Sequence, residues 1–152
     1  MEPTTRLQEM EPLLTSVERF EWRDEKRLDV YLPADKLLDE IRTLAKAGWR
    51  YLSAITGMDT PPAEDGSAEG RIEILYHFCE GPCVLTLRIS VPYSHPVAPS
   101  VCSLIPYATL YERELIEMFG VELEGTPSTA RLLLPDDWPD GVYPLRKAFK
   151  RL

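Results

Sequence analysis

The sequence predicts an α+β fold: a mixed or antiparallel sheet of about four strands, helices packed on that sheet, and an extended C-terminal arm. Residues 71–78 and 83–91 alternate apolar and polar side chains with the period of two that half-buried strands require. Residues 33–48 repeat apolar side chains with the period of an amphipathic helix. Residues 122–152 follow neither period, although they are rich in large apolar side chains. A helix lying on the sheet gives the α+β layer, and the aperiodic end gives the arm.

The N-terminal elements are predicted to be short. Residues 7–17 place apolar side chains at helical spacing, but Pro12 interrupts them, so a short helix or turn is expected. Residues 17–22 and 27–32 are separated by the charged segment 24–26, and the second of them alternates in polarity. This arrangement predicts a pair of strands joined as a hairpin.

The clearest helix is predicted for residues 33–48. Pro33 is favoured at a helix start, and Gly48 provides the left-handed stop that commonly follows a helix end. The apolar stripe is formed by Leu37, Leu38, Ile41, Leu44 and Ala45. Residues 49–56 then predict a strand of mixed polarity, and the composition of residues 60–70 predicts a surface loop.

The central strands are expected to form an antiparallel hairpin with one buried face. The turn 79–82 joins the alternating segments 71–78 and 83–91. Residues 92–99 are expected to be a loop, and a second helix is predicted for about residues 106–119.

Length and charge limit the function. A chain of 152 residues predicts one α+β domain, residues 1–121 with a core from 27 to 121, and an arm, residues 122–152. The net charge of −8 argues against nucleic acid and against electrostatic docking to anionic lipid. No run reaches the roughly 18 apolar residues of a membrane helix, and the acidic N-terminus lacks a signal-peptide pattern. We therefore expect a soluble chain that contacts a membrane only through partners.

The arm needs a surface to lie against. A solvated tail would not carry so much apolar surface, which is contributed by Leu132, Leu133, Leu134, Trp138, Tyr143, Leu145 and Phe149. Trp138 is the expected anchor, because large aromatic side chains dominate the energy of buried interfaces.

The second predicted helix carries carboxylates beside apolar surface. On a helical wheel, Glu112 and Glu114 both border apolar residues, whereas Arg113 and Glu117 share a narrow polar strip and can pair with each other. The predicted main apolar face contains Leu110, Tyr111, Leu115, Met118 and Phe119. A carboxylate in such a place is costly unless paired. The candidate cations are those of another chain or, in the arm, Arg131, Arg146 and Lys147.

Catalytic and metal-binding interpretations are also open. Glu112 and Glu114 could be an acid/base pair, but residues two apart on a helix point about 200° from each other. Cys79 and Cys83 could hold a metal with a histidine, namely His77 or His95, but the spacing is not that of a zinc site, and buried thiols are the simpler interpretation. Three cysteines are also too few for an iron–sulfur cluster held by this chain alone.

Two polar segments of the arm have simple alternatives. The acidic turn 135–141 could suggest calcium, but it lacks the length and terminal glutamate of a calcium loop, and ordinary turn chemistry explains it. Residues 144–147 could be a basic docking patch or a solvated C-terminus.

The motifs of the last third resemble a known family. They occur in the order Glu112-Arg113-Glu114, Phe119-Gly120, Leu132-Leu133-Leu134-Pro135-Asp136-Asp137-Trp138 and Pro144-Leu145-Arg146-Lys147. This order resembles the signature of the C-type subunit, the thirty-kilodalton subunit, of respiratory complex I, and the similarity extends over about residues 29–149. The resemblance implies that the family-signature and partner-interface residues are Glu112, Arg113, Glu114, Phe119, Gly120, Arg131, Leu134, Pro135, Asp136, Asp137, Trp138, Pro144, Leu145, Arg146 and Lys147.

The resemblance also implies the role. It predicts a cofactor-free structural subunit of the peripheral arm of an ion-translocating membrane oxidoreductase, at the cytoplasmic face. Its arm would lie across the D-type subunit, which resembles the large subunit of [NiFe] hydrogenases, near a B-type small subunit. Iron–sulfur clusters, with flavin or a [NiFe] centre, would belong to the partner subunits.

Two departures favour a second branch of the same family. Complex I members usually have Asp where Glu117 stands and Gly-His where Gly125-Thr126 stands. Residues 117–120 are similar to the equivalent subunits of membrane-bound [NiFe] hydrogenases and formate hydrogenlyases, so the electron donor and acceptor stay open. A stand-alone acidic enzyme using Glu112, Glu114 or the pair Asp136-Asp137 is the alternative from another class. If the arm wraps a partner, deleting residues 126–152 should abolish assembly and leave the sheet domain folded.

Overall fold

The computed structural model describes residues 3–151, which separate into two compact units. The first unit contains the residues up to Ile55 together with Leu75–Ile89. The second contains Thr56–Ile74 together with the residues from Ser90 onward. Residues 3–151 form a five-stranded sheet in the order β1-β2-β5-β4-β3 and a two-stranded sheet of β6 and β7. The α+β class is confirmed, with five strands in the main sheet where about four were predicted.

The N-terminal hairpin of the first unit is confirmed. Strands β1 (Arg19–Asp24) and β2 (Arg27–Tyr31) pair antiparallel, with an irregularity in register between Trp22 and Asp24. Strand β2 pairs parallel with β5 (Cys83–Pro92), which makes the sheet mixed. In turn, β5 neighbours β4 (Arg71–Glu80), and the two-residue connection between them is that of a hairpin.

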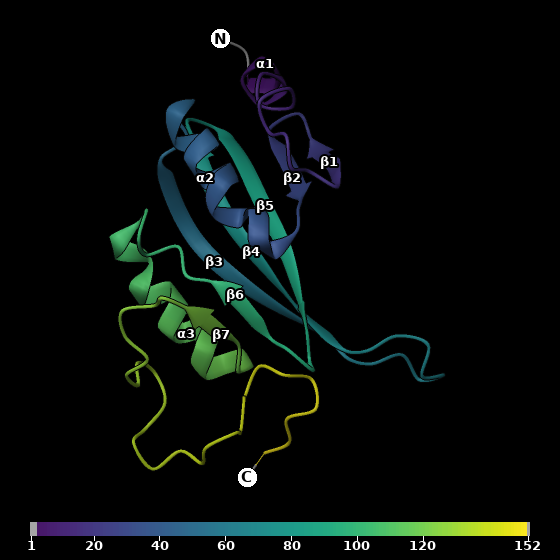
Figure 1. The fold of residues 1–152 in the computed structure, drawn as a ribbon, viewed down its shortest axis with the longest axis vertical. Helices are drawn as coiled ribbons and strands as arrows, with labels where there is room; N and C mark the ends of the chain where they lie inside the picture. The colour runs from purple at the N-terminus through teal and green to yellow at the C-terminus, as the bar shows by residue number, and fades with distance from the viewer. Residues whose placement is uncertain (1–2, 152) are drawn as a thin grey trace. The chain divides into compact units, whose positions relative to one another are not determined.

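Helix α2 (Leu37–Lys46) forms as predicted after a 3-10 turn at Ala34–Lys36, and Figure 1 shows it running along the strands. Its side chains Leu37, Ile41 and Leu44 are buried, because they occupy one stripe of an amphipathic helix. Gly48, with φ +93°, ends the helix in the left-handed conformation that favours glycine.

The N-terminal helix is earlier than predicted. Helix α1 spans Pro3–Gln8, and turns follow it within residues 7–17, where a short helix or turn was predicted, because Pro12 cannot donate a backbone hydrogen bond. The apolar residues of this segment are nevertheless buried, namely Leu7, Met10 and Leu14. Arg6 fixes the segment to the first unit by bonding Glu80 and the carbonyl of Ala47.

The second unit contains helix α3 (Thr109–Phe119), preceded by a 3-10 turn at Pro106–Ala108. Strands β6 (Val97–Pro99) and β7 (Glu122–Glu124) pair in parallel, so part of the predicted loop 92–99 and the first part of the arm are extended strands. Such short strands are invisible to periodicity, because three residues cannot show an alternation.

One glycine allows close packing of α3. Gly57, on the part of β3 (Tyr51–Thr60) that belongs to the second unit, faces the side chains of Leu115 and Phe119. A β-carbon at this position would overlap the Phe119 ring and lie 2.9 Å from Leu115 Cδ1. Glycine therefore lets these side chains reach the strand backbone.

Candidate functional site

The candidate site is the arm together with helix α3, both in the second unit. Figure 1 shows the arm (residues 122–152, of which residues to 151 are described) continuing from β7 past α3 to the C-terminus. Three charged residues of α3 find their partners outside the helix, and Arg113 and Glu117, four positions apart, share one helix face. These residues are Glu112, Arg113 and Glu117.

Glu112 anchors the segment before the helix. Its carboxylate is 0% exposed and accepts hydrogen bonds from Ser100 Oγ at 2.6 Å, Val101 N at 2.8 Å and Cys102 Sγ at 3.1 Å. The expectation that an arm cation would pair with Glu112 is therefore wrong. Neutral donors within the second unit replace the predicted cation, because buried carboxylates can be stabilised by backbone N–H groups.

Arg113 and Glu117 hold the arm. Arg113 donates from Nε to the Ala130 carbonyl at 2.9 Å and from Nη2 to the Arg131 carbonyl at 2.7 Å. Glu117 accepts from Leu132 N at 2.6 Å and Leu133 N at 2.9 Å. The prediction that Arg113 and Glu117 pair with each other is wrong, because each satisfies backbone groups of the next arm residues. We call this contact the backbone clamp.

The clamp stabilises the ionised form of Glu117. Burial by itself would raise the pKa of this carboxyl. The N–H groups of Leu133, Leu132 and Leu134, together with the charge of Arg131, outweigh burial and hold the pKa below its usual value. Glu117 is therefore an anionic acceptor at neutral pH.

The middle of the arm is closed by its own side chains. Arg131 donates to the Trp138 carbonyl at 3.0 Å and contacts Asp140, and Trp138 Nε1 donates to the Val142 carbonyl at 2.8 Å. The Trp138 ring lies 6.1 Å from the Phe149 ring, between centroids. These contacts make a compact turn, in which Trp138 is half-buried while its neighbours are exposed, namely Pro135, Asp136, Asp137, Pro139, Asp140 and Gly141.

The end of the arm returns to α3. Leu145 N donates to the Met118 carbonyl at 3.1 Å, and Arg146 Nε donates to the Phe119 carbonyl at 2.6 Å. The Arg146 guanidinium also lies 5.0 Å from the ring centroids of both Tyr93 and Tyr143. These bonds satisfy carbonyls of the last helical turn, which otherwise lack partners.

Asp59, near the end of β3, joins the arm to the turn that contains Tyr93 in the same unit, a role that sequence reasoning missed. Asp59 is 7% exposed; its Oδ2 accepts from Lys147 N at 2.8 Å, and its Oδ1 accepts from the Tyr93 hydroxyl. Burial, together with the hydrogen bond to Asp59, raises the pKa of Tyr93 to about 12. The three residues are far apart in sequence, and no local pattern links them.

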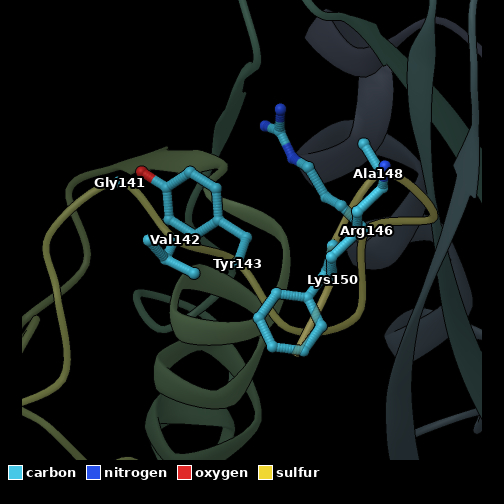
Figure 2. Close-up of a pocket in the computed structure, with 7 residues that line it drawn as sticks. Gly141, Val142, Tyr143, Arg146, Ala148 and Lys150 are labelled. Atoms are coloured by element: carbon cyan, nitrogen blue, oxygen red, sulfur yellow. The ribbon is translucent and has the colours of Figure 1, made fainter. Parts of the chain in front are cut away.

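An open pocket of about 350 Å³ lies within the arm. Figure 2 shows the side chains that line it, including the Tyr143 ring and the long Arg146 side chain. Its walls combine apolar groups with the basic residues Arg146 and Lys150, and no carboxylate lines it. The pocket therefore presents positive charge beside apolar groups.

The other predicted residues are placed as follows. Glu114, Leu145 and Lys147 are exposed, whereas Leu134 and Pro144 are half-buried. Glu112 and Glu114 do not come together, because one is fully buried and the other faces outward. No group of three or more His, Cys, Asp or Glu side chains suited to a metal ion occurs among residues 3–151.

Gly120 links α3 to the arm. Its φ is +74°, and a β-carbon there would overlap the Tyr143 ring. We expect Gly120→Ala to lower the free energy of unfolding by roughly 2–3 kcal/mol, since left-handed strain and overlap with Tyr143 add. Thermal or urea unfolding of the purified chain measures this loss.

Gly125→Ala is the matched control. Gly125 has φ +86°, but no atom lies within 4 Å of the place that a β-carbon would take, so only backbone strain of about 1 kcal/mol is expected. Equal losses for the two variants would show that Tyr143 does not press on Gly120.

Comparison with known proteins identifies the family. Residues 30–151 match the family described as the respiratory-chain NADH dehydrogenase, 30 Kd subunit. The chain belongs to this family. No helix within residues 3–151 has the length and apolar character needed to cross a membrane.

Relatives in the family differ in the complexes that their names give. The C-type subunit of NADH-quinone oxidoreductase from Moorella thermoacetica is 36% identical over 95% of this chain and 93% of its own length. Formate hydrogenlyase subunit 5 of Escherichia coli is 34% identical over 83% of this chain, which is 22% of its own length. The C/D subunit of NADH-quinone oxidoreductase from Methylococcus capsulatus is 32% identical over 78% of this chain and 21% of its own length.

A solved structure has the same fold. A chain of the membrane-bound sulfane sulfur reductase, an archaeal respiratory membrane complex, aligns with a TM-score of 0.81 and 28% identity. The alignment covers 96% of this chain and 84% of that one. The family thus includes subunits named for NADH-quinone oxidoreductase, formate hydrogenlyase and sulfane sulfur reductase.

Proposed function

We propose that this chain is a cofactor-free structural subunit of a complex I-type, membrane-bound, ion-translocating oxidoreductase. Its arm binds the D-type subunit, which resembles the large subunit of [NiFe] hydrogenases, and it lies near the B-type subunit at the cytoplasmic face. Membership of the 30 Kd subunit family supports this role. The C/D subunit of Methylococcus capsulatus supports the choice of partner, because its name joins the two subunits in one chain.

The observation that carries the proposal is that the arm is bound through its backbone while large apolar side chains of the arm stay exposed. Its backbone is tied to α3 through Arg113, Glu117 and Arg146, whereas Leu133 and Leu145 remain 61% and 53% exposed. A segment fixed by its backbone and exposing large apolar side chains is pre-organised for another surface, so less ordering entropy is lost on binding.

The redox reaction is that of the partners. Iron–sulfur clusters, with flavin or a [NiFe] centre, belong to the other subunits in this proposal. The relative named formate hydrogenlyase subunit 5 and the sulfane sulfur reductase structure support the same scaffold role in a hydrogenase-type complex as a second candidate. The two candidates differ in the electron donor and acceptor of the complex.

The geometry gives little support to a stand-alone acidic enzyme. Glu112 has its carboxylate oxygens engaged by donors of residues 100–102, and Glu114 faces outward. Asp136 and Asp137 are exposed on a turn. A carboxylate catalyst instead needs groups that converge on a concave pocket.

The test is a pull-down from native membranes. The tagged chain is extracted with mild detergent, and the co-purifying chains are identified by mass spectrometry. Flavin- and NADH-binding chains with a D-type subunit would indicate the complex I branch, whereas a large subunit with nickel-binding cysteine pairs would indicate the hydrogenase branch. Recovery of the chain alone would contradict the proposal.

Point variants sharpen this test more than deletion of residues 126–152, which would also remove the partners of Glu117 and Asp59. We expect Leu133→Asp or Leu145→Asp to lower recovery of the D-type subunit by about tenfold or more, because an interface leucine becomes a buried charge. Leu13→Asp is the control, since Leu13 is 49% exposed in the first unit, outside the arm. Equal recovery of the D-type subunit with all three variants would show that the arm is not part of the interface.

A further inference from the structure

Helix α3 and the 3-10 turn before it carry an exposed apolar surface that neither the core nor the backbone clamp uses. Tyr107 and Leu110 are 48% and 52% exposed, and Glu114 is also exposed. Leu110 and Glu114 lie one turn apart on α3, within roughly 40° of each other at about 100° per residue, and Tyr107 precedes them in the 3-10 turn Pro106–Ala108. Leu110, which was placed on the main apolar face, is therefore exposed and not part of the core, and we call this surface the outer stripe.

The outer stripe is bordered by half-buried side chains. The Tyr111 ring meets the Tyr107 ring edge-on, with centroids 6.4 Å apart and planes at 84°. Met118 continues the stripe one turn beyond Glu114, and its carbonyl accepts from Leu145 N of the arm. This hydrogen bond holds Leu145, whose side chain is exposed, beside the C-terminal end of the stripe.

Glu114 is the one carboxylate in the outer stripe. No hydrogen bond or ion pair joins it to any of residues 3–151. The nearest positions along its own face are Leu110, one turn before it, and Met118, one turn after it. While it is in contact with water, a carboxylate in this setting pays little desolvation free energy. If an apolar surface covered the stripe, the carboxylate would need a cation to offset the loss of water.

We propose that the outer stripe docks on a partner subunit whose contact surface presents an arginine or lysine inside an apolar patch, with that cation paired to Glu114. The inference rests on the proposed function, since it assigns a second contact surface within the same assembly. The negative charge of Glu114 favours a partner with a positively charged contact residue. Nucleic acid and anionic lipid would bring negative charge to a negative site in a chain of net charge −8.

The surface has the composition of an interface centre. Tyrosine is enriched in interface hot spots, and apolar neighbours that exclude water strengthen a charge pair at their centre. Tyr107, Leu110 and Tyr111 supply that apolar surround, and Glu114 supplies the charge. A second copy of this chain fits less well, because a twofold contact over the stripe would bring two Glu114 carboxylates into one interface.

The experiment uses the intact complex purified through the tagged chain. Glu114→Arg places a cation opposite the partner's cation, and we expect it to lower recovery of that subunit by about tenfold or more. Glu122→Arg is the matched control, because Glu122 is an exposed carboxylate of β7 with the same charge change. Circular-dichroism melting of each purified variant verifies that the chain still folds.

A photo-crosslinking amino acid at Leu110 identifies the occupant directly. We expect one crosslinked partner subunit, with the crosslink near a basic residue, and its loss in the Glu114→Arg background. Crosslinks only between copies of this chain, or an assembled complex without crosslinks and with full recovery of Glu114→Arg, would overturn the inference. If the complex assembles without crosslinks, the wild-type chain still co-purifies with its partners, so only this inference fails and the proposed function stands. If the wild-type chain does not co-purify with any partner, the proposed function itself fails.

Discussion

Replacing Glu112 with alanine is expected to lower the free energy of unfolding by about 3–4 kcal/mol, since buried donors lose their acceptor and a cavity forms. The carboxylate is fully buried and receives Ser100 Oγ, Val101 N and Cys102 Sγ. Water cannot readily replace the lost acceptor of the Val101 N–H, because Val101 itself is 0% exposed. An unpaired buried N–H is among the few single defects with effects of this size.

Urea unfolding of the isolated chain measures the loss. Glu112→Gln should lose less, about 1–2 kcal/mol, because its amide oxygen can still accept from Val101 N. Glu114→Ala is the control two residues away and should stay within about 0.5 kcal/mol of the wild type, because Glu114 is exposed. Similar losses for Glu112→Ala and Glu114→Ala would contradict the anchoring role of Glu112.

The comparison of these two glutamates shows where sequence reasoning ends. On a helical wheel, both border apolar surface and both need a partner. The structure separates them because residues 100–102 bring neutral donors to Glu112, whereas Glu114 lies on the outer stripe. Those donors are backbone and small polar groups, which composition and periodicity do not distinguish from any other loop.

The elements with clear periodicity were predictable. The hairpins β1–β2 and β4–β5 and the helices α2 and α3 all occur where alternation or helical spacing placed them. Gly48 ends its helix in the left-handed conformation as predicted, and Gly120 ends α3 in the same way. These features depend on neighbours within a few residues, so the local sequence contains the information that defines them.

The path of the arm was not predictable. Its contacts with α3 and Asp59 join residues separated by 15 to 88 positions. They also use backbone N–H and carbonyl groups of the arm, which every residue has. The sequence therefore predicts that the arm needs a surface, because of its leucines and aromatic residues, but not that its backbone would use α3 of its own unit.

Replacing Glu117 with alanine is expected to open the arm without unfolding the rest of the second unit. The change removes the acceptor of Leu132 N and Leu133 N, and hydrogen bonds to a charged group contribute about 1.5–3 kcal/mol each. We expect these two amides to exchange hydrogen about 30-fold faster or more, whereas amides of buried strand β5 keep their rates. Unchanged exchange at Leu132 and Leu133 would show that the backbone clamp is dispensable.

The pH dependence tests the same contact in the wild-type chain. The folded pKa of Glu117 lies below the usual value of 4.5, so the folded state binds its proton less tightly than the unfolded chain does. The stabilisation by the clamp is therefore fully present above about pH 4.5 and is lost as the pH falls through the lower, folded pKa. Protection of Leu133 N should decrease over that acidic range in the wild type, after correction for intrinsic exchange, and this dependence should be absent from Glu117→Gln. If Glu117→Gln showed the same acidic loss, protonation of Glu117 would not control the protection of Leu133 N, and the backbone clamp would not be its cause.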